Sequence, residues 1–159
     1  MKQQIITVLM VSAIAASAGN VSILFDQDDE PKDALVLKAP AKIIDGKAFS
    51  GEKMLEIPGT TENVQYSAFF KPVPVKPGDK IGFSCLYRTT NKFGTGLIVC
   101  IYQDEKGRAL TTENLRIRRS ADWDSVEHIF TVPDNPKIKQ AAVYIRRVKI
   151  AKTEKLFLD

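Results

Sequence analysis

The residue types that most often carry catalysis are scarce in this sequence and stand apart from one another. The chain has a single histidine, His128, which lies in the alternating run 126–130, where a hydrogen-bonded strand histidine is the ordinary outcome. The sequence contains no nucleophile-elbow motif, no glycine-rich phosphate loop and no histidine pair. A hydrolytic pair of carboxylates must be held across a cleft, and spacing along the chain does not establish that separation. We therefore predict no catalytic residue.

Carboxylates gather in one stretch near the N-terminus, where Asp26, Asp28, Asp29 and Glu30 follow Phe25. Hard cations such as Ca²⁺ bind several converging oxygens, which a stretch of this kind can supply. A solvated loop is the common alternative. A structural calcium site is therefore one hypothesis for this segment.

Aromatic residues and arginines supply the candidates for ligand binding. Sugar sites place flat aromatic faces against apolar C–H patches and polar side chains against hydroxyl groups. The candidates are the aromatic residues Tyr66, Tyr87, Tyr102, Trp123 and Tyr144, with the polar residues Arg88, Gln103 and Arg146 nearby. From them we select five carbohydrate-binding candidates, which are Tyr87, Arg88, Tyr102, Tyr144 and Arg146. Most aromatic side chains of a small domain lie in its core, so a packing role is the alternative for each ring.

The scaffold that must position these side chains is predicted to be all-β. Short β-branched and aromatic runs alternate with turn signals such as Asp45-Gly46, Pro77-Gly78-Asp79 and Lys106-Gly107, and no stretch sustains the 3.6-residue period of a helix. The predicted strands cover residues 34–38, 54–57, 64–71, 80–90, 95–104, 115–119, 125–132, 140–150 and 155–158. Eight or nine strands with this spacing predict one antiparallel β-sandwich of the jelly-roll type.

The two cysteines fall in consecutive predicted strands. If Thr90 and Thr95 face each other across a hairpin loop, the register places Cys85 opposite Cys100. A disulfide is then within reach in an oxidising compartment, whereas buried free cysteines are the equally ordinary alternative. Both sides of the two strands are largely apolar, which predicts a central place in the sheet.

The N-terminus has the pattern of a secretory signal peptide. A basic start, an apolar run and the small residues Ala16-Ser17-Ala18 predict cleavage after Ala18, which leaves a domain of residues 19–159. Removal of residues 1–18 takes away Lys2 and leaves 22 basic against 19 acidic residues, a net charge of +3. This charge is too small, and too scattered, to predict a nucleic-acid partner. We expect a secreted, periplasmic or cell-surface protein without a membrane partner after cleavage.

The order of several short motifs resembles that of a known family. These motifs are Phe49-Ser50-Gly51-Glu52-Lys53-Met54-Leu55, Val75-Lys76-Pro77-Gly78-Asp79-Lys80-Ile81 leading into Phe83-Ser84-Cys85-Leu86-Tyr87-Arg88, Ala121-Asp122-Trp123-Asp124 leading into Phe130-Thr131-Val132-Pro133, and Leu156-Phe157-Leu158-Asp159. Together they resemble carbohydrate-binding modules of the cellulose- and xylan-binding kind, which have a galactose-binding-like jelly roll. The resemblance covers nearly all of residues 25–159.

The resemblance implies a β-sandwich that holds a structural calcium ion and binds glycan chains on a concave sheet face. Asp26 and Asp159 occupy the matching places, and Glu52 follows the matching Ser-Gly turn, so these three are the candidate calcium ligands. The chain stops at Asp159, where such modules usually continue, so the resemblance implies either a truncated last strand or one domain of a longer protein. The sugar-binding aromatic residues of these modules follow no fixed local motif, so the resemblance transfers no individual binding residue.

These observations favour a secreted, non-catalytic module that binds a polysaccharide or oligosaccharide, and that serves as an appendage of a glycoside hydrolase if it is attached to an enzyme. The alternative is a structural or protein-interaction sandwich of a cell-surface or secreted protein. A small jelly-roll lyase or hydrolase is a third interpretation, which requires a tyrosine, histidine and arginine, or a carboxylate pair, to converge in one groove.

Overall fold

The computed structural model describes residues 9–11, 13–14, 21–23, 35–46, 48–60, 66–90, 96–146 and 153–159. These residues form fourteen strands and no helix. In chain order the strands are β1 (Leu9–Val11), β2 (Ala13–Ile14), β3 (Val21–Ile23), β4 (Leu35–Leu37), β5 (Lys42–Asp45), β6 (Lys53–Pro58), β7 (Tyr66–Phe70), β8 (Val73–Pro74), β9 (Lys80–Thr89), β10 (Gly96–Gln103), β11 (Ala109–Ile117), β12 (Asp124–Thr131), β13 (Gln140–Arg146) and β14 (Lys155–Leu158).

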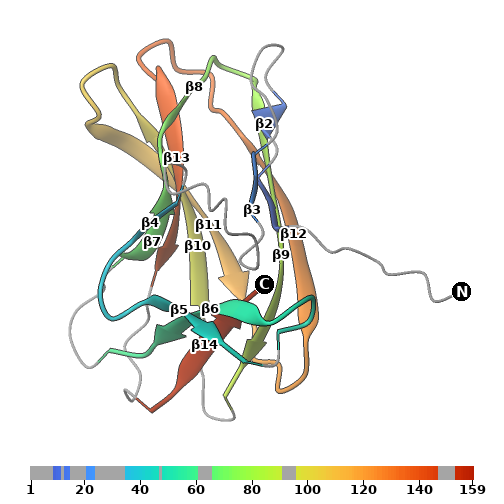
Figure 1. Ribbon diagram of the computed structural model, residues 1–159. Helices are drawn as coiled ribbons and strands as arrows, with labels where there is room; N and C mark the ends of the chain where they lie inside the picture. Colours follow the sequence, from blue (N-terminus) through green and yellow to red (C-terminus); the bar gives the residue numbers. More distant parts are fainter. Residues whose placement is uncertain are drawn as a thin grey trace, which may run out of the picture.

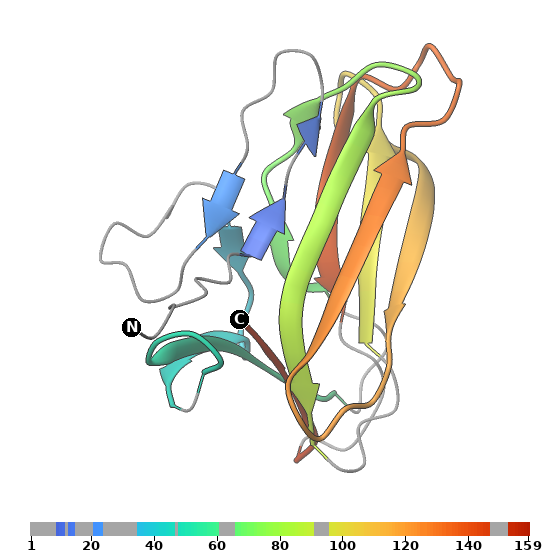
Figure 2. The same cartoon turned by 90° about the vertical axis from the view of Figure 1, so that its right-hand side faces the viewer.

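Two six-stranded antiparallel sheets face each other (Figures 1 and 2). The first, here called the β10 sheet, has the order β11-β10-β13-β7-β4, with β8 paired to β13. The second, the β9 sheet, has the order β12-β9-β14-β6-β5, with β2 paired to β9. The prediction of an all-β antiparallel sandwich is confirmed. The strand number is higher than the predicted eight or nine because the structure also has several strands of two to four residues.

The core lies between the sheets and follows the strict alternation of strand side chains. In β9 the odd-numbered residues Ile81, Phe83, Cys85 and Tyr87 are buried, and the even-numbered residues from Gly82 to Arg88 are only partly covered. The matching core positions of the β10 sheet include Ile98, Cys100, Tyr102, Val143 and Ile145. Because such rings fill the space between two sheets, truncation of Phe83 to alanine is expected to cost about 3–5 kcal/mol of stability.

The predicted hairpin between residues 80 and 104 is wrong. Strands β9 and β10 lie in different sheets: Cys85 pairs with Val126 of β12, whereas Cys100 pairs with Glu113 of β11 and Val143 of β13. The apolar pattern did identify two central strands, because β9 and β10 each have neighbours on both sides. A short connection between consecutive strands joins either neighbours in one sheet or strands in facing sheets, and the pattern of apolar residues is the same in both cases.

Strand β11 is also longer than predicted, since it begins at Ala109 rather than at residue 115. It is the edge strand of the β10 sheet, and its first four residues are exposed. An exposed edge strand lacks the apolar alternation that marks a strand in the sequence, so its polar first half could not be told from a loop.

The predicted turn at Pro77-Gly78-Asp79 is present and starts β9. Gly78 has a φ of 84°, a left-handed conformation that glycine adopts without steric cost. The Gly78 amide donates to the Val132 carbonyl over 2.9 Å, and the Val132 amide donates to the Asp79 carbonyl over 2.8 Å. These two bonds fasten the start of β9 to the end of β12.

Strands β1 and β2 fall within the segment predicted to be a signal peptide. Ala13 and Ile14 of β2 pair with Ile81 and Lys80 of β9, and β1 pairs with β3. The pairing does not test whether the segment is cleaved. Removal of residues 1–18 would take away β1 and β2, and Lys80 and Ile81 of β9 would lose their pairing with β2.

Candidate functional site

The outer face of the β10 sheet, which points away from the core, carries rows of side chains across neighbouring strands, and two of these rows contain its aromatic and basic residues. The pairing register defines the first row as Arg116, Leu97, Arg146 and Tyr66. It defines the second row as Asn114, Val99, Tyr144, Phe69 and Val36. Residues that are paired directly across a sheet on one face have side chains close enough to interact. The two rows therefore form one continuous surface over β11, β10, β13, β7 and β4.

Three rings of this face form a cluster, which we call the aromatic cluster: Tyr66, Phe69 and Tyr144. Tyr144 stacks on Phe69 with a centroid separation of 5.2 Å and an interplanar angle of 20°. The Tyr66 ring centroid lies 4.7 Å from that of Tyr144, and the two rings are tilted by 51°. All three side chains are half-buried. The ammonium group of Lys38 lies 5.5 Å from the centre of the Phe69 ring, within the range of a cation–π contact.

A β-bulge places Tyr66 in the aromatic cluster. The pairing runs from Ile145 opposite Ala68 to Arg146 opposite Tyr66, so that Ser67 is passed over. An extra residue in one strand changes which side chains share a face. Without the bulge, Tyr66 and Phe69 would point to opposite sides of the sheet.

Two buried polar atoms on this face have no hydrogen-bond partner in the part of the chain that the structure describes: Oε1 of Gln103 and Nε of Arg146. The Gln103 side chain also forms a hydrogen bond with Tyr144. Burial raises the pKa of Tyr144, while the Gln103 contact acts in the opposite direction. A buried polar atom without a partner costs free energy, so a polar ligand group that reaches either atom gains a favourable hydrogen bond.

Of the five predicted sugar-binding residues, Tyr144 and Arg146 lie together on this face. Tyr87 and Tyr102 instead point into the core, where 4% and 1% of their surface is exposed. The Tyr87 hydroxyl donates to Oδ2 of Asp124 over 3.1 Å, and the Tyr102 hydroxyl donates to the Thr131 carbonyl over 3.1 Å. A buried ring offers no face to a sugar, so the structure removes Tyr87 and Tyr102 from the candidate set.

Arg88 lies on the opposite side of the molecule, on the outer face of the β9 sheet. Its guanidinium carbon lies 4.8 Å from the centre of the Phe157 ring and 5.2 Å from the centre of the Trp123 ring. One of its terminal nitrogens lies 3.9 Å from the sulfur of Met54. These contacts give Arg88 a packing role, and the residue shares no face with Tyr144 and Arg146.

Sequence reasoning missed two residues of the site, Lys38 and Phe69. Phe69 and Phe70 are adjacent, and Phe70 is buried in the core whereas Phe69 points outward. A pair of neighbouring phenylalanines shows that one ring must face outward. Which of them does so depends on the register with β13 and β4.

The two cysteines are free thiols, so the structure does not contain the disulfide that was considered for Cys85 and Cys100. Both side chains are buried in the core, on facing sheets. Burial raises the pKa of the Cys85 thiol strongly and that of the Cys100 thiol to about 12. Thiols of this kind are inert packing residues rather than nucleophiles.

The structure describes only two of the three predicted calcium ligands, Glu52 and Asp159. Asp26, with the acidic run around it, lies outside the described residues. Asp159 is buried, and its Oδ2 accepts a hydrogen bond of 2.7 Å from the amide of Ser50, which stands two residues before Glu52. Within the described ranges, no three Asp, Glu, His or Cys side chains gather closely enough to hold a metal ion. The described residues alone therefore do not form the site, and calcium stays a prediction that depends on Asp26.

His128 has the structural role expected for it. Its Nε2 lies 2.9 Å from Oε1 of Glu113, and the other oxygen of Glu113 lies 3.2 Å from the Tyr102 hydroxyl. This contact joins β12 of one sheet to β11 of the other. Burial raises the pKa of Tyr102 far above its usual range, so this tyrosine does not supply a base.

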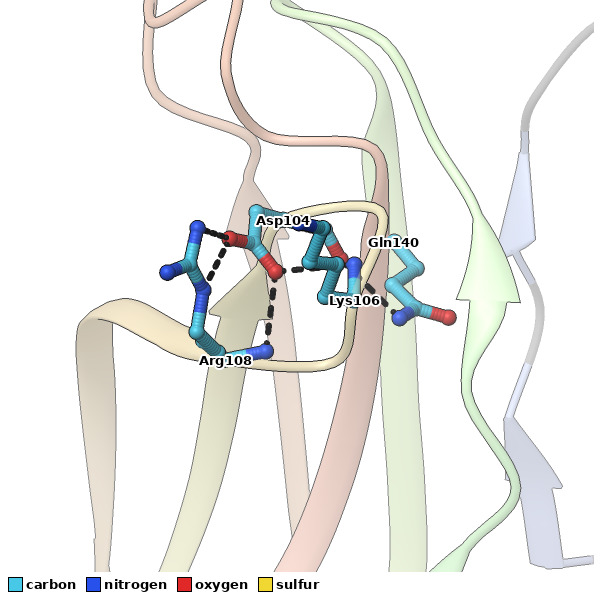
Figure 3. A network of polar contacts seen from close by, with 4 residues as sticks. All are labelled: Asp104, Lys106, Arg108 and Gln140. Carbon is cyan, nitrogen blue, oxygen red and sulfur yellow. Dashed lines mark hydrogen bonds and ion pairs between the residues drawn. The ribbon is translucent and has the colours of Figure 1, made fainter.

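A hollow of about 680 Å³ lies at one end of the β10 sheet, between the 104–110 and 136–139 segments. Figure 3 shows how the β10–β11 turn on its border is held. Oδ1 of Asp104 accepts the amides of Lys106 and Arg108, each over 2.9 Å, and Oδ2 accepts Nε of Arg108 over 2.7 Å. Gln140 donates to the Asp104 carbonyl over 3.0 Å. The turn is therefore fixed to β13, close to the Gln103 end of the outer face.

The comparison with solved structures finds the same architecture in sugar-binding proteins. The CBM22-1 xylan-binding domain of Paenibacillus barcinonensis Xyn10C is 13% identical, with a TM-score of 0.56 over 87% of this chain and 88% of that one. A family 16 carbohydrate-binding module is 19% identical, with a TM-score of 0.52 over 76% and 82% of the two chains. The chain has the fold of a carbohydrate-binding module.

The same module fold also occurs as part of larger chains. The enzymatically active domain of tailspike protein 4 from bacteriophage CBA120 is 13% identical over 79% of this chain, with a TM-score of 0.54. Our chain covers only 18% of that protein. No protein-family profile and no curated protein matches the sequence. The comparisons thus confirm, at the level of the fold, the resemblance inferred from the motifs.

Proposed function

We propose that this chain is a non-catalytic carbohydrate-binding module, and that it binds a polysaccharide or oligosaccharide on the outer face of the β10 sheet. The observation that carries the proposal is the aromatic cluster beside two buried polar atoms without a partner, Gln103 Oε1 and Arg146 Nε. The similarity of the fold to xylan-binding and other carbohydrate-binding modules supports it.

The chemistry of the face matches what a sugar offers. The half-buried rings of Tyr66 and Tyr144 provide apolar surface for the C–H groups of a pyranose ring. Gln103 provides an acceptor for a hydroxyl, and Arg146 provides a donor for a ring or hydroxyl oxygen. A mostly apolar surface with a few directed polar groups is the usual composition of a small-ligand site.

The charges of the same face support a binding role rather than a catalytic one. Of the described residues on it, the ionisable groups beside tyrosine are basic: Lys38, Arg116 and Arg146. Hydrolysis of glycosides by the common mechanism needs two carboxyl groups across the sugar. We propose that any catalysis belongs to a glycoside hydrolase to which such a module is attached.

We also propose export, based on the predicted signal peptide of residues 1–18. No helix in the described part of the chain has the length and apolar character needed to span a membrane. Expression with the native N-terminus in a bacterial host, followed by N-terminal sequencing of the periplasmic or secreted fraction, tests the proposal. A new N-terminus at Gly19 is expected, and an intact Met1 on cytosolic protein would contradict export.

The experiment that tests glycan binding is affinity electrophoresis and isothermal titration of the purified chain with a panel of soluble polysaccharides, together with pull-down on insoluble ones. We expect binding to at least one glycan, and binding that is about fivefold weaker in Tyr144→Ala. The control is Ile129→Ala, which removes a 57% exposed apolar side chain from the outer face of the β9 sheet.

Failure of the well-folded chain to bind any glycan would count against this proposal. It would favour a structural or protein-interaction sandwich. Binding that is unchanged in Tyr144→Ala but weakened in Ile129→Ala would move the site to the other sheet.

A further inference from the structure

The two outer faces of the sandwich differ in their charge. On the outer face of the β9 sheet, Glu56 forms ion pairs with Lys42 at 3.9 Å and with Lys155 at 2.7 Å. The outer face of the β10 sheet carries the cations Lys38, Arg116 and Arg146, and no carboxylate among the residues that the structure describes there. A carboxylate therefore pairs with basic groups on the β9 face, whereas the described residues of the β10 face provide none.

Two of these cations lie in one row. Leu97 pairs with Arg116 on one side and with Arg146 on the other. Since adjacent strands are about 4.8 Å apart, the Cα atoms of the two arginines are separated by roughly 10 Å. Arg116 is exposed, whereas Arg146 is partly buried beside Tyr66.

Arg146 has unused binding capacity. Its Nε is buried and has no hydrogen-bond partner, and the structure gives this guanidinium no ion pair within the described part of the chain. A buried guanidinium N–H without an acceptor loses its hydration and gains nothing in return. A carboxylate suits it well, because guanidinium and carboxylate form two parallel N–H···O bonds.

We propose that the ligand is an acidic polysaccharide containing uronic acid, whose carboxylate pairs with Arg146 while its ring packs on the aromatic cluster. This inference rests on the proposed function, since it names the substrate class of the same site. Arg116 binds a second negative charge along the chain or strengthens the attraction to the first. Lys38, over Phe69, adds positive potential at the other end of the second row.

A neutral glycan satisfies this site less well. Hydroxyl groups can accept from Nε of Arg146, but they leave the positive charges of the face without counter-charges. The experiment therefore compares acidic glycans with the same glycans made neutral. Polygalacturonate, alginate and glucuronoxylan are each titrated against the chain beside their carboxyl-reduced forms, in which every uronic acid has become a neutral sugar.

The variants are Arg146→Gln, Arg146→Lys and Arg116→Gln. The charge-matched control is Lys42→Gln, which removes one positive charge from the opposite face. We expect one acidic glycan to bind at least about tenfold more tightly than its reduced form, with binding that weakens as salt is added. Arg146→Gln should remove most of that preference, and Arg146→Lys should restore part of it. Lys42→Gln should change it less than twofold. If Arg146→Gln does not fold, Arg116→Gln still tests the inference, because Arg116 is exposed and its substitution should leave the fold intact.

Three outcomes overturn the inference. Equal affinity for an acidic glycan and its reduced form would reject the pairing of a ligand carboxylate with Arg146, and it would leave the proposed sugar site unaffected. Binding of dextran sulfate at equal affinity, insensitive to Arg146→Gln, would show attraction to charge alone. Absence of binding to every glycan, neutral or acidic, would reject the inference together with the proposed function.

Discussion

Tyr144 and Phe69 lie opposite each other on β13 and β7, and their rings stack with centroids 5.2 Å apart. Tyr144 thereby becomes the centre of the aromatic cluster, since its ring also contacts that of Tyr66, with centroids 4.7 Å apart. Both neighbours restrict the orientation of the Tyr144 ring before a ligand arrives. A preformed ring costs less conformational entropy on binding than a mobile one.

The first prediction concerns this ring. Tyr144→Ala should weaken binding of the best glycan about fivefold, because one aromatic contact contributes about 1 kcal/mol. Tyr144→Phe keeps the ring and should keep most of the affinity. Titration calorimetry of both variants, with thermal unfolding to verify the fold, measures this difference. Equal losses in the two variants would assign the contribution to the hydroxyl and its bond with Gln103 instead.

The second prediction separates Arg88 from ligand binding. Arg88→Ala should lower the free energy of unfolding by about 1–3 kcal/mol, because the contacts with Trp123 and Phe157 are lost. Glycan affinity should not change, since Arg88 belongs to the other sheet. Urea unfolding measures the free energy of unfolding of this variant, and glycan titration measures its affinity. A loss of affinity without a loss of stability would restore Arg88 as a binding residue.

The third prediction is a pH dependence that arises at Asp104. The Arg108 amide, followed by the Arg108 side chain and the Lys106 amide, lowers the pKa of this carboxyl below its ordinary value. A carboxyl whose pKa is lower in the folded state stabilises the protein above its unfolded pKa, which is about 3.9, and this contribution is lost as the pH falls through the folded value. Asp104→Asn should thus have a lower Tm than the parent chain at pH 7, with a difference that shrinks below about pH 4.

Melting curves from pH 2.5 to pH 8 measure this effect. Asp134→Asn, at an exposed loop position, is the control and should show no such convergence. A difference in Tm between Asp104→Asn and the parent chain that is the same at every pH would mean that Asp104 stabilises the fold through its shape and hydrogen bonds and not through its charge.

The fourth prediction concerns the thiols. A thiol reagent at pH 8 should react very slowly with the folded chain, because Cys85 and Cys100 are buried and their raised pKa values keep them protonated. In denaturant without reductant, two thiols per chain should react. If protein purified from an oxidising compartment shows none, the cysteines have formed a disulfide and the sheets have moved to allow it.

The fifth prediction tests calcium. If Asp26, Glu52 and Asp159 hold a calcium ion, saturating calcium should raise the Tm of the parent chain relative to chelator, with a gain of about 2.7 kcal/mol at a concentration 100 times Kd. Asp159→Ala should abolish that gain. In chelator the variant should still be less stable, because the hydrogen bond from Ser50 is lost. Equal losses in calcium and in chelator would reject a metal at this site.

Several features of the fold could be predicted from the sequence because they depend on local patterns of residues. The β-branched and aromatic run at 80–90 predicted a strand, and the Pro77-Gly78-Asp79 signal predicted the turn before it. Two apolar faces correctly marked β9 and β10 as central strands. The site itself was predicted only in part, through Tyr144 and Arg146.

The remainder was decided by the tertiary structure. Tyr87, Tyr102 and Tyr144 occupy equivalent strand patterns, yet the first two point into the core and the third points outward. The period of two in a strand shows which residues share a face, and it does not say which face meets the other sheet. That choice depends on the partner strands, on the bulge beside Arg146, and on whether a loop joins strands in one sheet or in two. Local residue types thus determined the strands and turns, whereas long-range pairing brought Tyr66, Phe69, Tyr144 and Arg146 onto one face.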